Sequence, residues 1–140
     1  MRFLTLAFVA LLGLGSPALA QQHYVAQPSA AELENADVLL VDIRRPEEWA
    51  QTGVLPNAHL LTYEAFATPQ EFLAALAPQL EEGRPVALIC RTGNRTNIAA
   101  RELATLLDQP VIDIQGGIFR LMRDGYQPKA PTREQGCVTC

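Results

Sequence analysis

The chain has 140 residues and a formal net charge of −4, because 15 acidic side chains outnumber 11 basic ones. Hydrophobic residues make up 49% of the sequence, which is enough for one compact core, and the length is that of one domain. The acidic balance argues against nucleic acid as the main partner, and equally against an anionic membrane surface.

The first twenty residues differ in composition from the rest of the chain. One cation, Arg2, precedes an apolar run from Phe3 to Leu14, and small residues follow up to Ala20. This pattern is typical of a secretory signal peptide that is cleaved after Ala20. A membrane anchor is the competing interpretation, but the apolar run is shorter than the roughly 20 residues that cross a bilayer. We therefore expect residues 1–20 to be removed on export to the periplasm, with no stable membrane insertion afterwards.

Short predicted elements alternate along the chain, as hydrophobic spacing and capping residues indicate. A continuous apolar run predicts a buried strand at residues 38–41, and further strands are predicted at residues 58–61, 85–89 and 111–114. Helices are predicted from Pro46 onwards and at residues 30–36, 69–80, 97–107 and 118–123. This alternation indicates an α/β fold in which helices cover both faces of a parallel sheet. Ligands of such sheets bind outside the carboxyl ends of the strands.

Local signals set the bounds of the helices. Ser29 and Glu32 form a capping box, and Thr68 is an N-cap with a proline behind it. Gly83 is expected to stop the helix that begins at residue 69. The predicted apolar side of the helix over residues 97–107 consists of Ile98, Leu103, Leu106 and Leu107.

Cys90 directly follows a predicted strand and opens the loop "CRTGNRT", which leads into a helix. Three features of this loop favour a thiolate. The predicted helix begins near Thr96 and points its N-terminal amides at the loop. Arg91 and Arg95 supply cations, and Gly93 lets successive amides converge on one point. A lone cysteine after an apolar strand is otherwise a small buried hydrophobic residue, but this setting predicts a nucleophile.

The size of the loop narrows the chemistry. The spacing from Cys90 to Arg95 is Cys-x4-Arg. Cysteine phosphatases have a similar region with Cys-x5-Arg, which leaves a wider cradle for a tetrahedral phosphate. The tighter loop suits a single sulfur atom that is carried on the cysteine and surrounded by amides.

The loop "CRTGNRT" resembles the active-site loop of single-domain rhodaneses, a family of sulfurtransferases. Three further segments support the resemblance: "LLVDIRRPEEW" (39–49), "GVLPNAHLL" (53–61) and "IDIQGGIFRLMRDGY" (112–126). Four motifs in the order of the family are far more specific than one. The resemblance covers roughly residues 25–128, and it implies a small, doubly wound, mostly parallel sheet of five strands with helices on both faces.

The resemblance also implies a double-displacement reaction. The Cys90 thiolate would take a sulfane sulfur from thiosulfate or a similar donor as a persulfide. A thiophilic acceptor would then remove that sulfur; cyanide, a small thiol and a periplasmic protein thiol all qualify. No organic cofactor and no metal are implied.

The resemblance gives each residue of the loop an expected role. Cys90 and Arg95 are the predicted catalytic residues, with Arg95 binding the sulfonate end of thiosulfate through charge-assisted hydrogen bonds. Arg91 either shares that contact or lies solvated at the rim of the cleft. Thr96 is expected to cap the helix and to offer its hydroxyl to the loop. The amides expected to stabilise the persulfide charge belong to Arg91, Thr92, Gly93, Asn94, Arg95 and Thr96.

Other conspicuous residues have simpler interpretations. Asp42 and Arg44 are expected to form a structural ion pair near a strand end rather than to take part in catalysis. His23 and His59 have no spacing that indicates a metal site, and Trp49 is expected in the core.

Cys137 and Cys140 form a Cys-x-x-Cys motif in a tail over residues 129–140, behind a folded domain over residues 21–128. No second pair completes a zinc site, so we expect either a local disulfide or a redox pair, with Cys90 left as a free thiol. Two alternatives to a sulfurtransferase stay open. One is a thiol redox enzyme that uses Cys90 with the tail cysteines, and the other is a sulfur carrier or binding module without turnover.

Overall fold

The computed structural model describes residues 22–140. The predicted signal peptide, residues 1–20, lies outside the described residues. Within the described part of the chain, no helix is long and apolar enough to cross a membrane.

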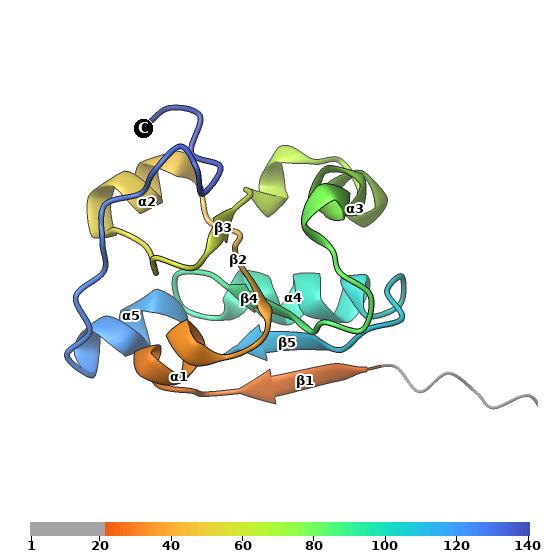
Figure 1. Cartoon of the computed structure of the whole chain (residues 1–140), viewed down its shortest axis with the longest axis horizontal. Helices are drawn as coiled ribbons and strands as arrows, with labels where there is room; N and C mark the ends of the chain where they lie inside the picture. The colour runs from red at the N-terminus through yellow and green to blue at the C-terminus, as the bar shows by residue number, and fades with distance from the viewer. Residues whose placement is uncertain (1–21) are drawn as a thin grey trace, which may run out of the picture.

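A five-stranded sheet forms the centre of the molecule (Figure 1). Its strands are β1 (His23–Ala26), β2 (Leu39–Asp42), β3 (His59–Leu60), β4 (Val86–Ile89) and β5 (Val111–Ile114). The order across the sheet is β1-β5-β4-β2-β3, and every pairing is parallel. All residues of β2 and β4 are buried, as their continuous apolar runs predict. The predicted α/β fold is confirmed, with strands that are all parallel.

Helices cover both faces of the sheet. They are α1 (Ala30–Asn35), α2 (Pro46–Thr52), α3 (Pro69–Leu76), α4 (Asn94–Leu103) and α5 (Gly117–Arg123). Buried side chains of α1, α2 and α5 belong to one hydrophobic cluster, and those of α3 and α4 belong to a second cluster. Successive residues of β2 and β4 alternate between these two clusters, because neighbouring side chains of a strand point to opposite faces.

The strand order places the carboxyl ends of β2 and β4 side by side at the point where the sheet changes direction. The chain runs outward from β2 to β3, then returns to β4 on the other side of β2 and continues to β5. In open α/β sheets, ligands bind outside the strand ends at such a switch point. Cys90 is the residue after β4, so the topology puts it at this position.

Two predicted helices end or begin elsewhere. The α3 helix stops at Leu76 and a 3-10 turn, Ala77–Gln79, follows, because the proline at 78 cannot continue the α-helical hydrogen bonds. The α4 helix starts at Asn94, three residues before the predicted start. Its buried stripe is Thr96, Ala99, Ala100 and Leu103, and Ile98, predicted to be buried, is 61% exposed. This stripe follows the i, i+3, i+4, i+7 spacing, which Ile98 does not share.

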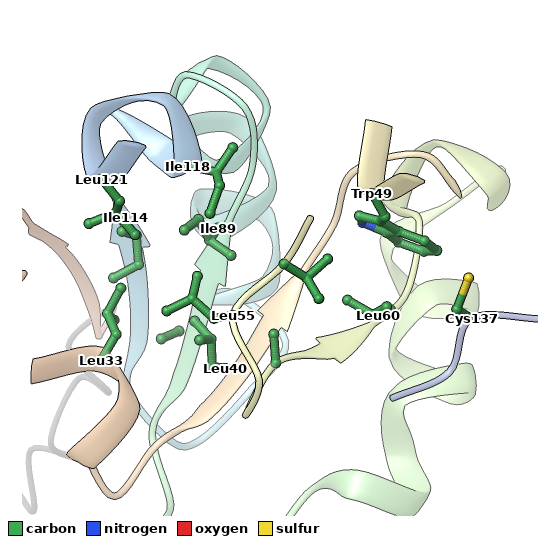
Figure 2. Packing of buried hydrophobic residues seen from close by; sticks show 13 residues of the cluster. Leu33, Leu40, Trp49, Leu55, Leu60, Ile89, Ile114, Ile118, Leu121 and Cys137 are labelled. Atoms are coloured by element: carbon green, nitrogen blue, oxygen red, sulfur yellow. The ribbon is translucent and has the colours of Figure 1, made fainter. Parts of the chain in front are cut away.

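The segment after α5 contains no helix, yet it packs along the edge of the sheet. Lys129 pairs with Val54 in an isolated antiparallel bridge, and the Leu60 amide donates to the Gln135 carbonyl at 2.6 Å. The Cys137 side chain is fully buried in the first hydrophobic cluster, beside Leu60 and on the same side as Trp49 (Figure 2). The tail therefore contributes to the core.

A buried ion pair joins the end of β2 to α2. The Arg44 Nη2 atom lies 2.6 Å from Asp42 Oδ2, and neither side chain is exposed. Asp42 also accepts a hydrogen bond from Trp49 Nε1 at 3.1 Å. The Arg44 guanidinium donates further to Thr52 Oγ1 at 2.7 Å and to the Gly53 carbonyl at 2.8 Å. The predicted structural ion pair is thus confirmed, and its hydrogen bonds satisfy the buried charges.

Replacing Asp42 by asparagine should lower the free energy of unfolding by about 3–5 kcal/mol, because Arg44 would keep a buried charge without its counterion. Urea denaturation followed by circular dichroism measures this. The matched control is Glu81→Gln, which removes an exposed carboxylate from its partner Arg84 and should cost less than about 1 kcal/mol. Equal costs for both variants would contradict the structural role of the buried pair.

Candidate active site around Cys90

The Cys90 thiol lies at the base of the loop between β4 and α4. The side chain is fully buried and belongs to the same cluster as the buried face of α4. The backbone amide of Gly93 donates to Cys90 Sγ at 3.1 Å. An N–H group that points at sulfur from this distance favours a negative charge there.

Gly93 allows this geometry because it has a φ of 96°, in the left-handed region that side chains rarely adopt. It is also the N-cap of α4. A Cβ atom at this position would lie 2.9 Å from the backbone nitrogen of Gly116, so the close approach of two backbone segments also requires glycine. The loop can therefore close around the sulfur only with glycine here.

Thr96 lies in the first turn of α4 and faces the sulfur. Its Oγ1 atom is 3.7 Å from Cys90 Sγ, and its hydroxyl donates to the Gly93 carbonyl at 3.1 Å. Thr96 is not the helix cap, since the cap position is occupied by Gly93; the predicted cap is wrong. The predicted contact of the hydroxyl with the loop is present. Because a hydroxyl carries one proton, it donates either to the carbonyl or to the sulfur.

Arg95, the expected sulfonate ligand, is paired with carboxylates. Its Nη2 and Nη1 atoms donate to the two oxygens of Glu48 at 2.6 and 2.7 Å, and Nη1 lies 3.3 Å from Glu64 Oε2. Glu64 also accepts two hydrogen bonds from Arg45, each of 2.9 Å. This network joins α4, α2 and the 3-10 turn Tyr63–Ala65.

The network fixes the charges of its members. Burial opposes the ionisation of Glu48, but the hydrogen bonds from Arg95 and from the Arg45 amide outweigh it and lower the pKa of Glu48 to about 2. The hydrogen bond to Glu48 in turn raises the pKa of Arg95 above its ordinary value. Both groups are therefore charged throughout the physiological range.

Arg91 presents the other cation of the loop. Its side chain is exposed, and the guanidinium carbon lies 5.6 Å from the centroid of the Phe119 ring, within the range of a cation–π contact. Among the described residues, no carboxylate pairs with Arg91. Thr92 and Asn94, the remaining residues of the loop named from the sequence, are also exposed.

The start of α5 packs against the backbone of the loop. The amide of Ile118 donates to the Cys90 carbonyl at 2.9 Å, and the amide of Phe119 donates to the Arg91 carbonyl at 3.1 Å. A Cβ atom on Gly117 would lie 2.3 Å from the Cys90 carbonyl oxygen, so only glycine fits there. This role of α5 was not predicted from the sequence, although the pair Gly116 and Gly117 at the start of the helix is the signal.

The tail cysteines lie apart from Cys90. Cys137 forms a disulfide with Cys140, and Cys90 is a free cysteine. Cys137 belongs to the first hydrophobic cluster and Cys90 belongs to the second, so the two lie on opposite faces of the sheet. The structure does not bring the tail pair and the Cys90 loop together.

The fold and this loop define a small α/β protein with one free cysteine at the switch point of a parallel sheet. The sequence matches the rhodanese-like domain over residues 26–124, and the chain therefore belongs to the rhodanese-like family. A sulfurtransferase of Allochromatium vinosum is 34% identical over 98 residues, which make up 70% of this chain and 84% of that protein.

Solved structures agree with the assignment. The crystal structure of a rhodanese-related protein from Thermoplasma volcanium is similar with a TM-score of 0.54 and 28% identity, covering 71% of this chain and 93% of that one. The solution structure of a polysulfide-sulfur transferase homodimer from Wolinella succinogenes has a TM-score of 0.57 and 22% identity, covering 79% and 80% of the two chains. This second likeness shows a shared fold.

The low pKa of Glu48 predicts a pH dependence of stability. Because the folded-state pKa is depressed from 4.5 to about 2, the stabilisation is fully present above pH 5 or so and is lost as the pH falls towards 2. The difference in unfolding free energy between the wild type and Glu48→Gln should therefore shrink over that range. Urea denaturation of both proteins at several pH values measures this difference in unfolding free energy. Glu47→Gln, which changes an exposed acid on the same helix, is the control and should show no such trend.

Proposed function

We propose that this protein is a sulfurtransferase that carries a sulfane sulfur on Cys90. The observation that supports it best is the amide of Gly93, which points at Cys90 Sγ from 3.1 Å. The family assignment and the similarity to a sulfurtransferase agree with this chemistry. The same amide would serve the persulfide, because its negative charge needs hydrogen-bond donors in a site that is closed to water.

The proposed reaction has two displacements. In the first, the Cys90 thiolate attacks the outer sulfur of thiosulfate; a new S–S bond forms, the S–S bond of thiosulfate breaks, and sulfite leaves with the bonding electron pair. In the second, a thiophilic acceptor such as cyanide or a thiolate attacks the outer sulfur of the persulfide. The S–S bond breaks again and Cys90 leaves as the thiolate, so no net oxidation of the protein occurs.

The Thr96 hydroxyl is proposed to change its hydrogen bond with the charge on the sulfur of Cys90. When Cys90 is a thiol, its S–H group can donate to Thr96 Oγ1 while the hydroxyl donates to the Gly93 carbonyl. When the sulfur is negative, the hydroxyl turns and donates to it. One side chain would thus provide an acceptor before ionisation and a donor afterwards.

The two arginines of the loop would have different tasks. Arg95 is held by Glu48 and Glu64, so its charge is already compensated and it acts as a positioning residue for the loop. Arg91 has no carboxylate partner among the described residues and is the better cation for the sulfonate end of thiosulfate. Because the Cys90 thiol is fully buried, a donor would reach it only when the residues that cover the sulfur move.

We also propose that the protein works in the periplasm, after removal of residues 1–20. The support is the pattern of one cation, an apolar run and small residues up to Ala20. N-terminal sequencing of protein recovered from the periplasmic fraction should begin at Gln21. Recovery of chains that still begin at Met1, in the cytosolic fraction alone, would contradict the proposed export.

Thiocyanate formation from thiosulfate and cyanide tests the proposed function. Cys90→Ser should reduce the rate to background, because the nucleophile is lost. The double variant Cys137→Ser/Cys140→Ser should keep the wild-type rate. A requirement for the tail cysteines would instead favour a thiol redox enzyme, and a stoichiometric persulfide without turnover would favour a sulfur carrier.

Thr96→Val removes the hydroxyl at nearly constant volume and should slow sulfur transfer about 10-fold, since one donor to the developing charge is lost. Mass spectrometry of thiosulfate-treated protein measures the gain of one sulfur atom on Cys90 over time. Thr105→Val is the matched control, because its hydroxyl is exposed and donates only to the Glu102 carbonyl. An unchanged rate in Thr96→Val would remove the proposed role of this hydroxyl.

A further inference from the structure

Removal of the signal peptide gives the mature chain a histidine at its third position. Cleavage after Ala20 leaves Gln21-Gln22-His23 as the first three residues. The new α-amine, the next two backbone amides and the imidazole are four nitrogens that can close chelate rings around one metal ion. In the part of the chain that the structure describes, no group of three or more histidine, cysteine or acidic side chains could hold a metal. A site at His23 therefore has to use backbone nitrogens.

The position of β1 leaves the backbone amide of His23 without a partner in the sheet. β1 is the outermost strand, beside β5 (Figure 1). The Gln22 carbonyl accepts a hydrogen bond from the Val111 amide at 2.8 Å. The Ala26 carbonyl accepts one from the Gln115 amide at 2.9 Å. Because the backbone groups of successive strand residues point in alternate directions, the amide of His23 points away from β5, towards the open edge. A metal that binds this amide displaces no hydrogen bond of the sheet.

The ring of His23 is placed by the fold as well. The side chain is half-buried, and its Nε2 atom is buried without a hydrogen-bond partner among the described residues. Nδ1 is the ring nitrogen that lies closer, along the covalent structure, to the His23 amide, so both nitrogens can bind the same ion. A neutral imidazole is a common metal ligand. Because the fold buries Nε2, Nδ1 is the nitrogen left for a metal, and it is also the one that completes the chelate.

We propose that the mature N-terminus binds one Cu(II) ion through the amine of Gln21, the amides of Gln22 and His23, and Nδ1 of His23. The inference goes beyond the proposed sulfur transfer and rests on the proposed removal of residues 1–20. A square-planar set of nitrogen ligands suits Cu(II) or Ni(II), and Cu(II) binds such ligands more tightly. The terminal ammonium and the two amides each release one proton, and nothing is oxidised or reduced.

The proposed copper site lies away from the reactive cysteine. All strands of the sheet are parallel, and His23 opens β1 whereas Cys90 follows the end of β4. The two residues therefore lie at opposite ends of the strands, with β5 between β1 and β4. A copper ion on Nδ1 of His23 does not reach Cys90 Sγ, so the metal and the thiol can be tested separately.

Copper titration of the mature protein tests the inference. Protein is recovered from the periplasm, and mass spectrometry checks that the N-terminal glutamine has kept its amine, since its cyclisation with loss of ammonia blocks that ligand. We expect one equivalent of Cu(II), with a visible absorption band and the nitrogen splittings of a four-nitrogen site in the electron paramagnetic resonance spectrum. Both signals should disappear on acidification, because the amides regain their protons.

Three matched pairs of variants locate the ligands. Gln22→Pro removes a backbone N–H and should abolish the signals, whereas Gln22→Ala should keep them. His23→Gln should abolish them, and His59→Gln, a change of the other histidine, should not. One alanine inserted before Gln21 moves the histidine to the fourth position and should abolish the signals, although every side chain of the folded domain is kept. Cys90→Ser should bind copper as the wild type does.

Unchanged copper signals in His23→Gln or in the extended chain would show adventitious binding elsewhere and overturn the inference, as would a requirement for Cys90. A mature chain that begins at any residue other than Gln21 would overturn it too, because the ligand set would not exist. Neither result bears on sulfur transfer, which is measured by thiocyanate formation. Loss of that activity in the wild type, with copper binding intact, would overturn the proposed function alone.

Discussion

The docking of α5 on the Cys90 loop is the constraint on which the site depends. Two consecutive carbonyls, those of Cys90 and Arg91, accept hydrogen bonds from α5. These two carbonyl oxygens face α5, whereas the amide of Gly93 in the same loop donates to Cys90 Sγ. Two glycines make the contact possible, since Gly117 lies against the Cys90 carbonyl and Gly93 lies against the Gly116 nitrogen. Backbone geometry, more than side-chain charge, thus shapes the cradle of the sulfur.

Electrostatics holds the rest of the loop in place. Arg95 on α4 forms ion pairs with Glu48 of α2 and with Glu64. The hydrogen bonds from Arg95 are one cause of the lowered pKa of Glu48. These ion pairs restrict where the start of α4 can lie, and the charge of Arg95 also interacts with Cys90. Arg91 lies against the Phe119 ring and has no carboxylate partner among the described residues, so its charge is available to ligands.

Most of the sheet could be predicted from the sequence, because β2, β4 and β5 are short, mainly apolar segments with turn residues around them. The β1 strand was missed because it lies at the edge of the sheet and exposes Tyr24 and Val25, so its pattern carries little burial signal. The cysteine loop was located from local chemistry alone. The buried stripe of α4 was misjudged because small alanines, rather than large aliphatic residues, face the sheet.

The partners of Arg95 could not be predicted, because Glu48 and Glu64 are 47 and 31 residues away along the chain and no local pattern connects them. The burial of Cys137 could not be predicted either, because the site beside β3 in which it packs exists only in the folded chain. Side-chain pairs between distant segments depend on the register of the strands and on how the helices pack on the sheet. A short stretch of sequence shows neither.

The position of the cysteines has a consequence for the redox behaviour of the protein. The sheet separates Cys137 of the tail disulfide from Cys90, since the two side chains lie in different core layers. Thiol–disulfide exchange between them needs the attacking sulfur in contact with the bridge, so it proceeds only from molecules that have opened. Exchange between Cys90 and the tail disulfide within one molecule therefore requires at least one of the two segments to leave its place in the core.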